Sequence, residues 1–154
     1  MHEALLEPRP ERMPLARLLP RVGTAVARRF ARAAAEHGLT PTAFGVLGLL
    51  AGSDAVSHRE LAAHLGLAPG TLTPVVDTLE ARGELRRRRD RGDRRVVRLS
   101  ITNAGRERLR EASGGIAAAM GAALPEPAPE HAAIVRDYLL AVLSATGDEE
   151  GARE

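Results

Sequence analysis

The feature that most constrains this chain is the stretch from Ser57 to Thr102, where two short amphipathic segments precede an arginine-rich run. Between Arg82 and Arg98 the run contains nine arginines and three carboxylates, a local charge of +6 in a chain whose net charge is +2. The positive charge is therefore concentrated in one short part of the sequence. Because arginine presents a rigid, planar set of donors that suits phosphate groups, this run favours a polyanionic partner.

The first amphipathic segment has the signature of a helix start. Ser57 and Glu60 have the spacing of a capping box, in which each side chain binds a backbone N–H group of the first turn. Apolar residues at helical spacing follow, and Gly66 suits the left-handed conformation that commonly ends a helix. The sequence therefore predicts a short helix and then a tight turn.

The second amphipathic segment begins near Pro69, which suits the first position of a helix because its missing N–H group would have no partner there. Apolar residues from Leu72 to Leu79 recur at helical spacing, so the two segments together predict a helix-turn-helix. The outward face is mostly small and uncharged, and its residues are Gly70, Thr71, Thr73, Pro74, Asp77 and Thr78. Such a face can lie on the floor of a DNA major groove, where hydroxyl and methyl groups contact base edges.

The arginine-rich run has the pattern of a β-hairpin. Leu85–Arg89 and Arg95–Ile101 have strand character, and the residues from Asp90 to Asp93 are typical of a turn. Alternation in the second strand should direct three side chains inward, those of Val97, Leu99 and Ile101. The expected fold class is mainly α with a small β-hairpin wing, in which arginines lie at the tip of the wing.

The order of these pieces resembles the winged helix-turn-helix of the MarR family of bacterial transcriptional regulators. The similarity covers residues 40–105 and is carried by three segments, LTPTAFGVLGLLA, ELAAHLGLAPGTLTPVVDTLEARG and DRGDRRVVRLSITNAG. Two positions depart from the family pattern. Ala68 stands where a serine usually caps the recognition helix, and Thr78 stands where a basic residue is common.

The resemblance implies a set of DNA-binding residues. In the family, an aspartate of the wing braces an arginine that enters the minor groove, which implies that Asp93 braces Arg95. Arg91 or Arg94 would then lie nearest the tip of the wing. With the outward face of the second helix, the expected DNA contacts are Ser57, Gly70, Thr71, Thr73, Pro74, Thr78, Arg91, Asp93, Arg94 and Arg95.

The rest of the sequence divides into helices and flexible ends. Residues 1–13 should be a loose arm and residues 147–154 a disordered tail. We expect a dimerisation helix in residues 14–38, the winged domain in 39–102 and two further dimerisation helices in 103–146. Gly114 and Gly115 fall in the middle of the first of these two helices, where a hinge or a close helix crossing would account for them.

The apolar stripes of the terminal helices require a partner, and a second copy of the chain is the simplest one. In MarR relatives these helices intertwine into a dimer, which implies a homodimer on a pseudo-palindromic operator. Relatives often bind small aromatic or amphipathic effectors in a crevice beside these helices. The candidates near such a crevice are Phe30, His37, Phe44 and Leu47.

Several other classes of protein are disfavoured. The chain has no cysteine, and its five histidines show no metal-ligand spacing, so neither a metal nor another cofactor is expected. Phosphate loops and hydrolase motifs are also lacking, which argues against an enzyme. No apolar run is long enough for a membrane span and no leader is apparent, so a cytoplasmic location is expected.

The preferred hypothesis is a homodimeric, sequence-specific DNA-binding regulator of the MarR type, a repressor that responds to a ligand. Non-specific architectural or RNA-binding proteins are one alternative, although the basic region lacks the aromatic side chains on which single-stranded RNA stacks. A metal-sensing winged-helix regulator is another, although it would need cysteine or clustered histidine ligands.

Overall fold

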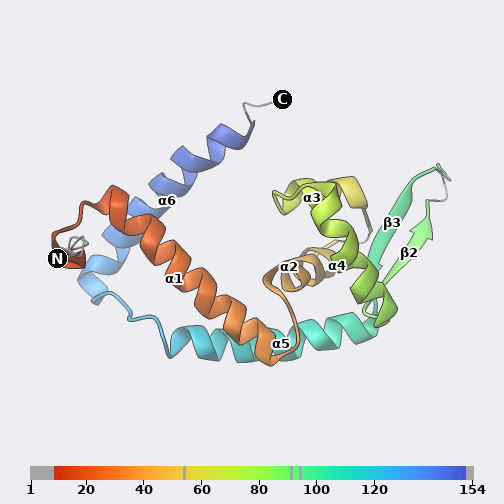
Figure 1. Ribbon diagram of the computed structural model, residues 1–154, viewed down its shortest axis with the longest axis horizontal. Helices are drawn as coiled ribbons and strands as arrows, with labels where there is room; N and C mark the ends of the chain where they lie inside the picture. The colour runs from red at the N-terminus through yellow and green to blue at the C-terminus, as the bar shows by residue number, and fades with distance from the viewer. Residues whose placement is uncertain (1–8, 54, 91, 94, 152–154) are drawn as a thin grey trace, which may run out of the picture. The chain divides into compact units, whose positions relative to one another are not determined.

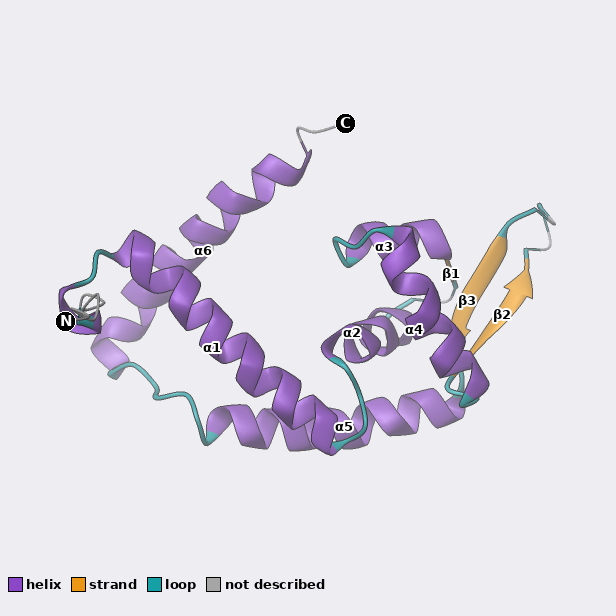
Figure 2. Ribbon diagram, in the orientation of Figure 1, coloured by secondary structure: helices purple, strands orange, loops and turns teal. Residues whose placement is uncertain are grey.

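The computed structural model describes residues 9–53, 55–90, 92–93 and 95–151. It is mainly helical with one small sheet, as the sequence predicts (Figures 1 and 2). After a 3-10 turn at Pro10–Arg12, the elements are α1 (Leu15–Glu36), α2 (Pro41–Ala51), β1 (Val56–Ser57), α3 (His58–His64), α4 (Pro69–Ala81), β2 (Leu85–Arg89), β3 (Val97–Ile101), α5 (Asn103–Gly121) and α6 (Pro129–Gly151). The chain divides into two compact units, residues 1–120 and residues 121–154.

The sheet has three antiparallel strands in the order β1-β3-β2. The hairpin of β2 and β3 was expected, with Leu85 opposite Ile101 at its base. The short strand β1 was not, because two residues directly before a helix cap carry no readable alternation. It pairs Ser57 with Arg98 and so joins the start of α3 to the wing.

Fewer side chains of β3 are buried in the core than the alternation predicted. Leu99 and Ile101 are buried, whereas Val97 is 40% exposed. Val97 pairs with Arg89 at the outer end of the hairpin, beyond the packed core. The strand also begins at Val97 rather than at Arg95, because the backbone N–H of Val96 bonds to the carbonyl of Asp93 within the turn.

The core of the first unit is made of aliphatic side chains from α2, α3, α4 and the sheet. Its largest fully buried members are Leu47, Leu50, Leu61, Leu72, Leu79, Leu85, Leu99, Val46 and Val76. Phe30 on α1 and Phe44 on α2 pack against this core and meet edge to face, with 5.5 Å between their ring centroids. Burial of each large aliphatic side chain stabilises the fold by about 1.5–3 kcal/mol.

The two long helices of this unit begin and end at recognisable signals. α1 begins at Leu15 and continues through Pro20, which lies inside its second turn. Gly38, with a φ of 64°, follows its end. Thr102 caps α5 by accepting the N–H of Gly105 at 3.1 Å, and α5 then runs without a break through Gly114 and Gly115.

The two central glycines of α5 have different surroundings. A Cβ atom added to Gly115 would lie 2.0 Å from Nε2 of His37, whereas one added to Gly114 would have no neighbour within 4 Å. Gly115 therefore marks a close crossing between α5 and the end of α1, one of the two explanations that the sequence left open. Gly114 is not required by packing.

The second unit contains α6, which continues to Gly151, past residue 146, where the sequence predicted the last helix to end and a disordered tail to begin. The helix carries a series of exposed apolar side chains, Ile134, Val135, Tyr138, Leu139, Leu140 and Leu143. No helix in the described part of the chain is both long and apolar enough to cross a membrane.

Candidate nucleic-acid interface

The helix-turn-helix forms as its sequence signals indicate. Ser57 Oγ accepts the N–H of Glu60 at 3.2 Å, and Glu60 Oε2 accepts the N–H of Ser57 at 2.6 Å, which completes the capping box. Gly66 has a φ of 61° in the turn. Pro69 is the first residue of α4, and Ala68 before it provides no side-chain cap.

One side of α4 is exposed along its whole length, as the sequence predicted. The six residues of this face are Gly70, Thr71, Thr73, Pro74, Asp77 and Thr78. The hydroxyl of Thr73 donates to the carbonyl of Pro69 at 3.1 Å, and that of Thr78 donates to the carbonyl of Pro74 at 2.8 Å. Since both protons are used within the helix, these oxygens present acceptor lone pairs outward.

His58 on α3 also contacts this face, which sequence analysis did not foresee. Its Nε2 lies 3.4 Å from Oγ1 of Thr73. If Thr73 donates its proton to Pro69, the His58 tautomer that carries hydrogen on Nε2 is the one that can donate in this contact. This contact links the start of α3 to the exposed face of α4.

A second link joins the recognition helix to the wing. The guanidinium of Arg87 on β2 donates to Asp77 at 2.6 Å and to Glu80 at 2.5 Å, both on α4. The hydrogen bond to Asp77, followed by Glu80, raises the pKa of Arg87 above its usual value. Arg87 is thus a structural arginine that binds the wing to α4.

A third link runs from the wing to the cap of α3. Arg98 Nε donates to Asp90 Oδ2 at 3.0 Å, and its Nη1 donates to Glu60 Oε2 at 2.9 Å. Asp90 Oδ1 also accepts the N–H groups of Gly92 and Asp93, at 2.7 and 3.1 Å. One guanidinium therefore connects the turn of the wing to the start of α3.

These contacts shift the ionisation of the two carboxylates. Hydrogen bonds from the N–H of Gly92 and then from Arg98 lower the pKa of Asp90. The pKa of Glu60 is lowered first by the N–H of Ser57, with a further contribution from Arg98. Both groups are therefore held as anions at neutral pH.

The wing aspartate named from the family resemblance contacts Arg95, the residue expected, and it does so through the Arg95 backbone. Asp93 Oδ1 accepts the backbone N–H of Arg95 at 2.9 Å, so it orders the turn through the main chain. The aspartate that holds a guanidinium within the described part of the wing is Asp90, through Arg98. Arg91 and Arg94, the expected tip residues, lie outside the described residues.

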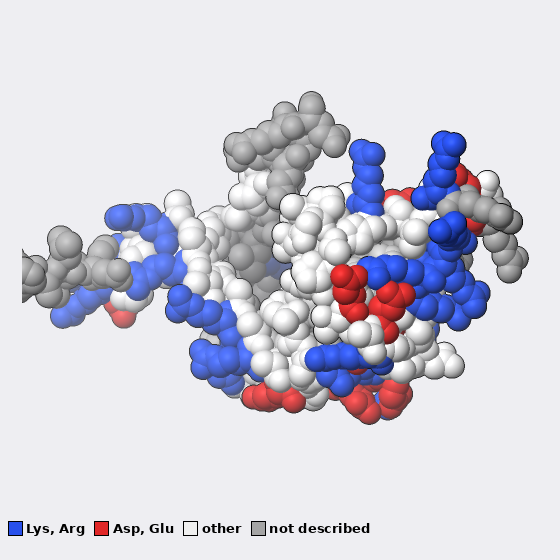
Figure 3. Space-filling view, turned by 45° about the vertical axis from the view of Figure 1, so that its right-hand side comes forward, with Lys and Arg blue, Asp and Glu red and all other residues white. Residues whose placement is uncertain are grey.

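Carboxylates neutralise some of the arginines, so the hairpin presents less free positive charge than the sequence suggests. Figure 3 shows basic side chains gathered over the wing end with acidic side chains among them. Carboxylates of α3 and α4 contribute to the pairing of Arg87 and Arg98. No described carboxylate pairs with Arg88, Arg89 or Arg95, which are exposed and available to a polyanion.

At the base of the wing, three elements meet at one carbonyl group. The oxygen of Gly38, between α1 and α2, accepts Arg82 Nη1 at 3.2 Å and Arg108 Nη2 at 3.3 Å. Arg108 of α5 also lies 3.8 Å from the buried carboxylate of Glu84. The end of α4, the turn after α1 and the start of α5 are therefore held together.

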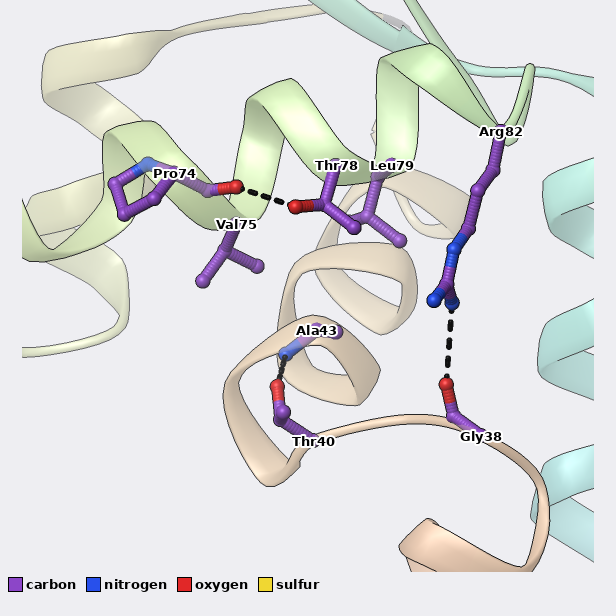
Figure 4. A pocket seen from close by; sticks show the side chains of 8 residues that line it. All are labelled: Gly38, Thr40, Ala43, Pro74, Val75, Thr78, Leu79 and Arg82. Atoms are coloured by element: carbon purple, nitrogen blue, oxygen red, sulfur yellow. Dashed lines mark hydrogen bonds between the residues drawn. The ribbon is translucent and has the colours of Figure 1, made fainter.

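A pocket of about 260 Å³ lies beside this junction (Figure 4). It is open to solvent and mostly apolar, and α4 forms one wall while the start of α2 forms the other. Its lining residues are Gly38, Thr40, Ala43, Pro74, Val75, Thr78, Leu79 and Arg82. Pro74 and Thr78 belong both to this pocket and to the exposed face of α4.

The effector candidates suggested by the sequence do not line this pocket. Leu47 is fully buried in the core, and Phe30 and Phe44 pack against each other. His37 lies against Gly115 of α5. Among the described residues, no group of three or more histidine, cysteine, aspartate or glutamate side chains could hold a metal ion.

Comparisons with known proteins agree with this architecture. A family model described as MarR family matches residues 37–96. The transcriptional repressor CouR bound to a 23-mer DNA duplex is 31% identical, with a TM-score of 0.74 over 87% of this chain and 92% of CouR. The chain belongs to the MarR family. CouR from Rhodococcus jostii has also been solved with p-coumaroyl-CoA, and that structure is 29% identical with a TM-score of 0.71 over 88% of this chain and 95% of CouR.

Curated relatives match over shorter regions. The HTH-type transcriptional regulator TtmR of Methylorubrum extorquens is 42% identical over 53% of this chain, which spans only 44% of TtmR. The uncharacterized HTH-type transcriptional regulator YkoM of Bacillus subtilis is 36% identical over 63% of each chain. These relatives are named as transcriptional regulators and not as enzymes.

Proposed function

We propose that this MarR-family chain is a homodimeric, ligand-responsive repressor that binds a pseudo-palindromic DNA operator. The observation that carries the proposal is the exposed, mostly uncharged face of α4 beside a wing whose outer arginines are unpaired with described carboxylates. Base contacts would come from Gly70 to Thr78, and phosphate contacts from the Ser57 cap, Thr71 and the arginines of the wing. Arg95 remains the proposed minor-groove residue, and Arg91 or Arg94 would lie nearest the tip of the wing.

Exposed apolar surface supports the homodimer. The α6 side chains Ile134, Leu140 and Leu143 are 68%, 56% and 66% exposed, and Leu15 at the start of α1 is 57% exposed. Exposure of these apolar side chains to water is energetically unfavourable, and symmetric pairing would cover them in both copies. A dimer would also hold two recognition helices about 34–36 Å apart, one turn of DNA.

The pocket beside α4 supports a response to ligands. Its apolar walls and the donors of Arg82 suit a small amphipathic molecule, the class to which the acyl part of the CouR ligand belongs. Because Pro74 and Thr78 are shared between the pocket and the proposed DNA face, an occupant would compete with DNA. This mechanism needs no change in the distance between the two copies.

The proposal is tested by selecting duplexes from a random library and measuring the affinity of the enriched sequences. A dimeric repressor should enrich an inverted repeat and bind it about a thousandfold more tightly than random duplex. Sedimentation should give twice the chain mass, and Leu143→Glu should shift it toward the monomer and weaken binding to the full repeat. Equal affinity for all duplexes would favour an architectural protein, and loss of affinity on addition of a chelator would favour a metal sensor.

A further inference from the structure

We propose that Arg98 is a positioning residue that sets the direction of the wing relative to the recognition helix, and so controls readout of the sequence flanking the operator. The inference rests on the proposed function, because it assumes that the wings reach the flanking minor grooves. Arg98 itself need not contact DNA. Its role is to fix the orientation of the hairpin, which presents the unpaired arginines Arg88, Arg89 and Arg95.

The geometry of Arg98 suits this part. Its guanidinium uses separate nitrogens for Asp90 in the turn of the wing and Glu60 in the capping box, at 3.0 and 2.9 Å. Asp90 in turn accepts two N–H groups of the turn, and Glu60 accepts the N–H of Ser57. A continuous series of charge-assisted hydrogen bonds therefore connects the start of α3 to the turn between β2 and β3.

The position of Arg98 in the sheet adds a second reason. Arg98 stands between Ser57 on β1 and Arg88 on β2, directly opposite both. Arg88 and Arg98 would repel each other across the strands if neither had a carboxylate partner. The two carboxylates on Arg98 remove this repulsion, which leaves Arg88 beside it as an exposed cation.

Arg87 holds the middle of the hairpin to α4, but the outer end of the wing has few other contacts with the core. Val97 is 40% exposed, and the buried side chains of the hairpin, Leu85, Leu99 and Ile101, lie nearer its base. Without Arg98, the hairpin beyond Arg87 could change direction, and minor-groove readout depends on where an arginine is placed within a groove of sequence-dependent width. Loss of Arg98 should therefore affect the flanks of the operator more than its centre.

The experiment uses operator duplexes selected by the wild-type chain, with the centre fixed and the flanks made either A/T-rich or G/C-rich. The wild type should prefer A/T flanks by about tenfold, because A-tracts have narrow minor grooves that attract arginine. Arg98→Gln should reduce this preference to about twofold or less while its discrimination against substitutions in the centre is kept. Hydroxyl-radical protection of the flanks should be lost in the same variant.

Two further variants keep the test independent of folding. Asp90→Asn, which retains Glu60 and the cap of α3, should also reduce the flank preference. Arg110→Gln removes an equally charged side chain that pairs with Glu107 on α5, and it should change neither preference. Circular dichroism and thermal unfolding would confirm that each variant is folded.

The outcomes separate this inference from the proposed function. If folded Arg98→Gln or Asp90→Asn keeps the flank preference, or if flank and centre discrimination fall together, Arg98 does not set the wing direction. If the wild type selects an operator but ignores its flanks, the inference is overturned and the proposed function stands. If the wild type selects no operator at all, the proposed function fails first.

Discussion

Arg87 Nη2 on the wing lies 2.6 Å from Oδ1 of Asp77 on the recognition helix, so the only charged group on the described outward face of α4 is already paired. Glu80 shares the same guanidinium. The pairing matters because a bare carboxylate at Asp77 would repel the phosphates of any DNA that approached α4.

Arg87→Gln should therefore weaken DNA binding by more than the loss of one cation would suggest. We expect a loss of about 1–3 kcal/mol in binding and no more than about 1 kcal/mol in the free energy of unfolding, because the pair is partly exposed. Fluorescence anisotropy and urea denaturation measure the two quantities. Adding Asp77→Asn should recover part of the binding, and no recovery would show that repulsion by Asp77 is not the cause.

Asp93→Ala should weaken DNA binding although it removes a negative charge. The Asp93 carboxylate accepts the N–H of Arg95, so its loss should disorder the turn that carries Arg95. Asp93→Asn keeps an oxygen acceptor at the same place and should bind nearly as well as the wild type. Tighter binding by Asp93→Ala, measured at constant salt, would mean that the wing acts through net charge alone.

Gly114→Ala and Gly115→Ala should have opposite effects on stability. Gly114→Ala should raise the free energy of unfolding by about 0.5–1 kcal/mol, since its position is open and glycine disfavours helix. Gly115→Ala should lower it by about 1–3 kcal/mol, because the added methyl group meets the ring of His37. Denaturant unfolding measures both, and His37→Ala should restore much of the stability of Gly115→Ala if this contact is responsible.

The Arg98 network should contribute stability above about pH 4 and lose it in acid. Asp90 and Glu60 have pKa values lowered by folding, and a carboxylate of this kind stabilises the folded state above its unfolded pKa. That contribution disappears as the pH falls through the lowered values. The melting temperatures of the wild type and Asp90→Asn should therefore differ at neutral pH and converge toward about pH 2, and a constant difference would exclude this linkage.

The affinity of the proposed dimer for DNA should fall steeply with salt. If each copy neutralises ~3–4 phosphates, log affinity should change with log salt at a slope of about −5 to −7. Arg88→Gln and Arg89→Gln should each make the slope shallower by about 2, one contact in each copy, whereas Arg110→Gln should leave it unchanged. A slope near zero would contradict a phosphate-binding wing.

Local signals allowed much of the fold to be predicted. The capping box at Ser57, the turn at Gly66 and the proline that opens α4 each act within a few residues, so they are visible in one sequence. The outward face of α4 followed from helical spacing. Family membership could also be predicted, because it depends on the order of these local pieces.

The roles of individual charges could not be predicted in the same way. Arg87 and Arg98 sit in an arginine run where every member looks alike, and their partners Asp77 and Glu60 lie 10 and 38 residues away along the chain. Alternation gives a partial signal, since Arg87 pairs with buried Leu99 and so faces α4. Strand register, which sequence alone did not supply, was needed to assign the rest.

The separation of paired from unpaired arginines has a consequence for how such a wing can change. Arg87 and Arg98 belong to the scaffold, and their replacement would disturb the shape of the hairpin. Arg88, Arg89 and Arg95 have no described carboxylate partner, so evolution or an engineer could exchange them with little effect on folding. Recognition of new operators could then arise through a few surface substitutions, while Arg87 and Arg98 keep the hairpin in its orientation.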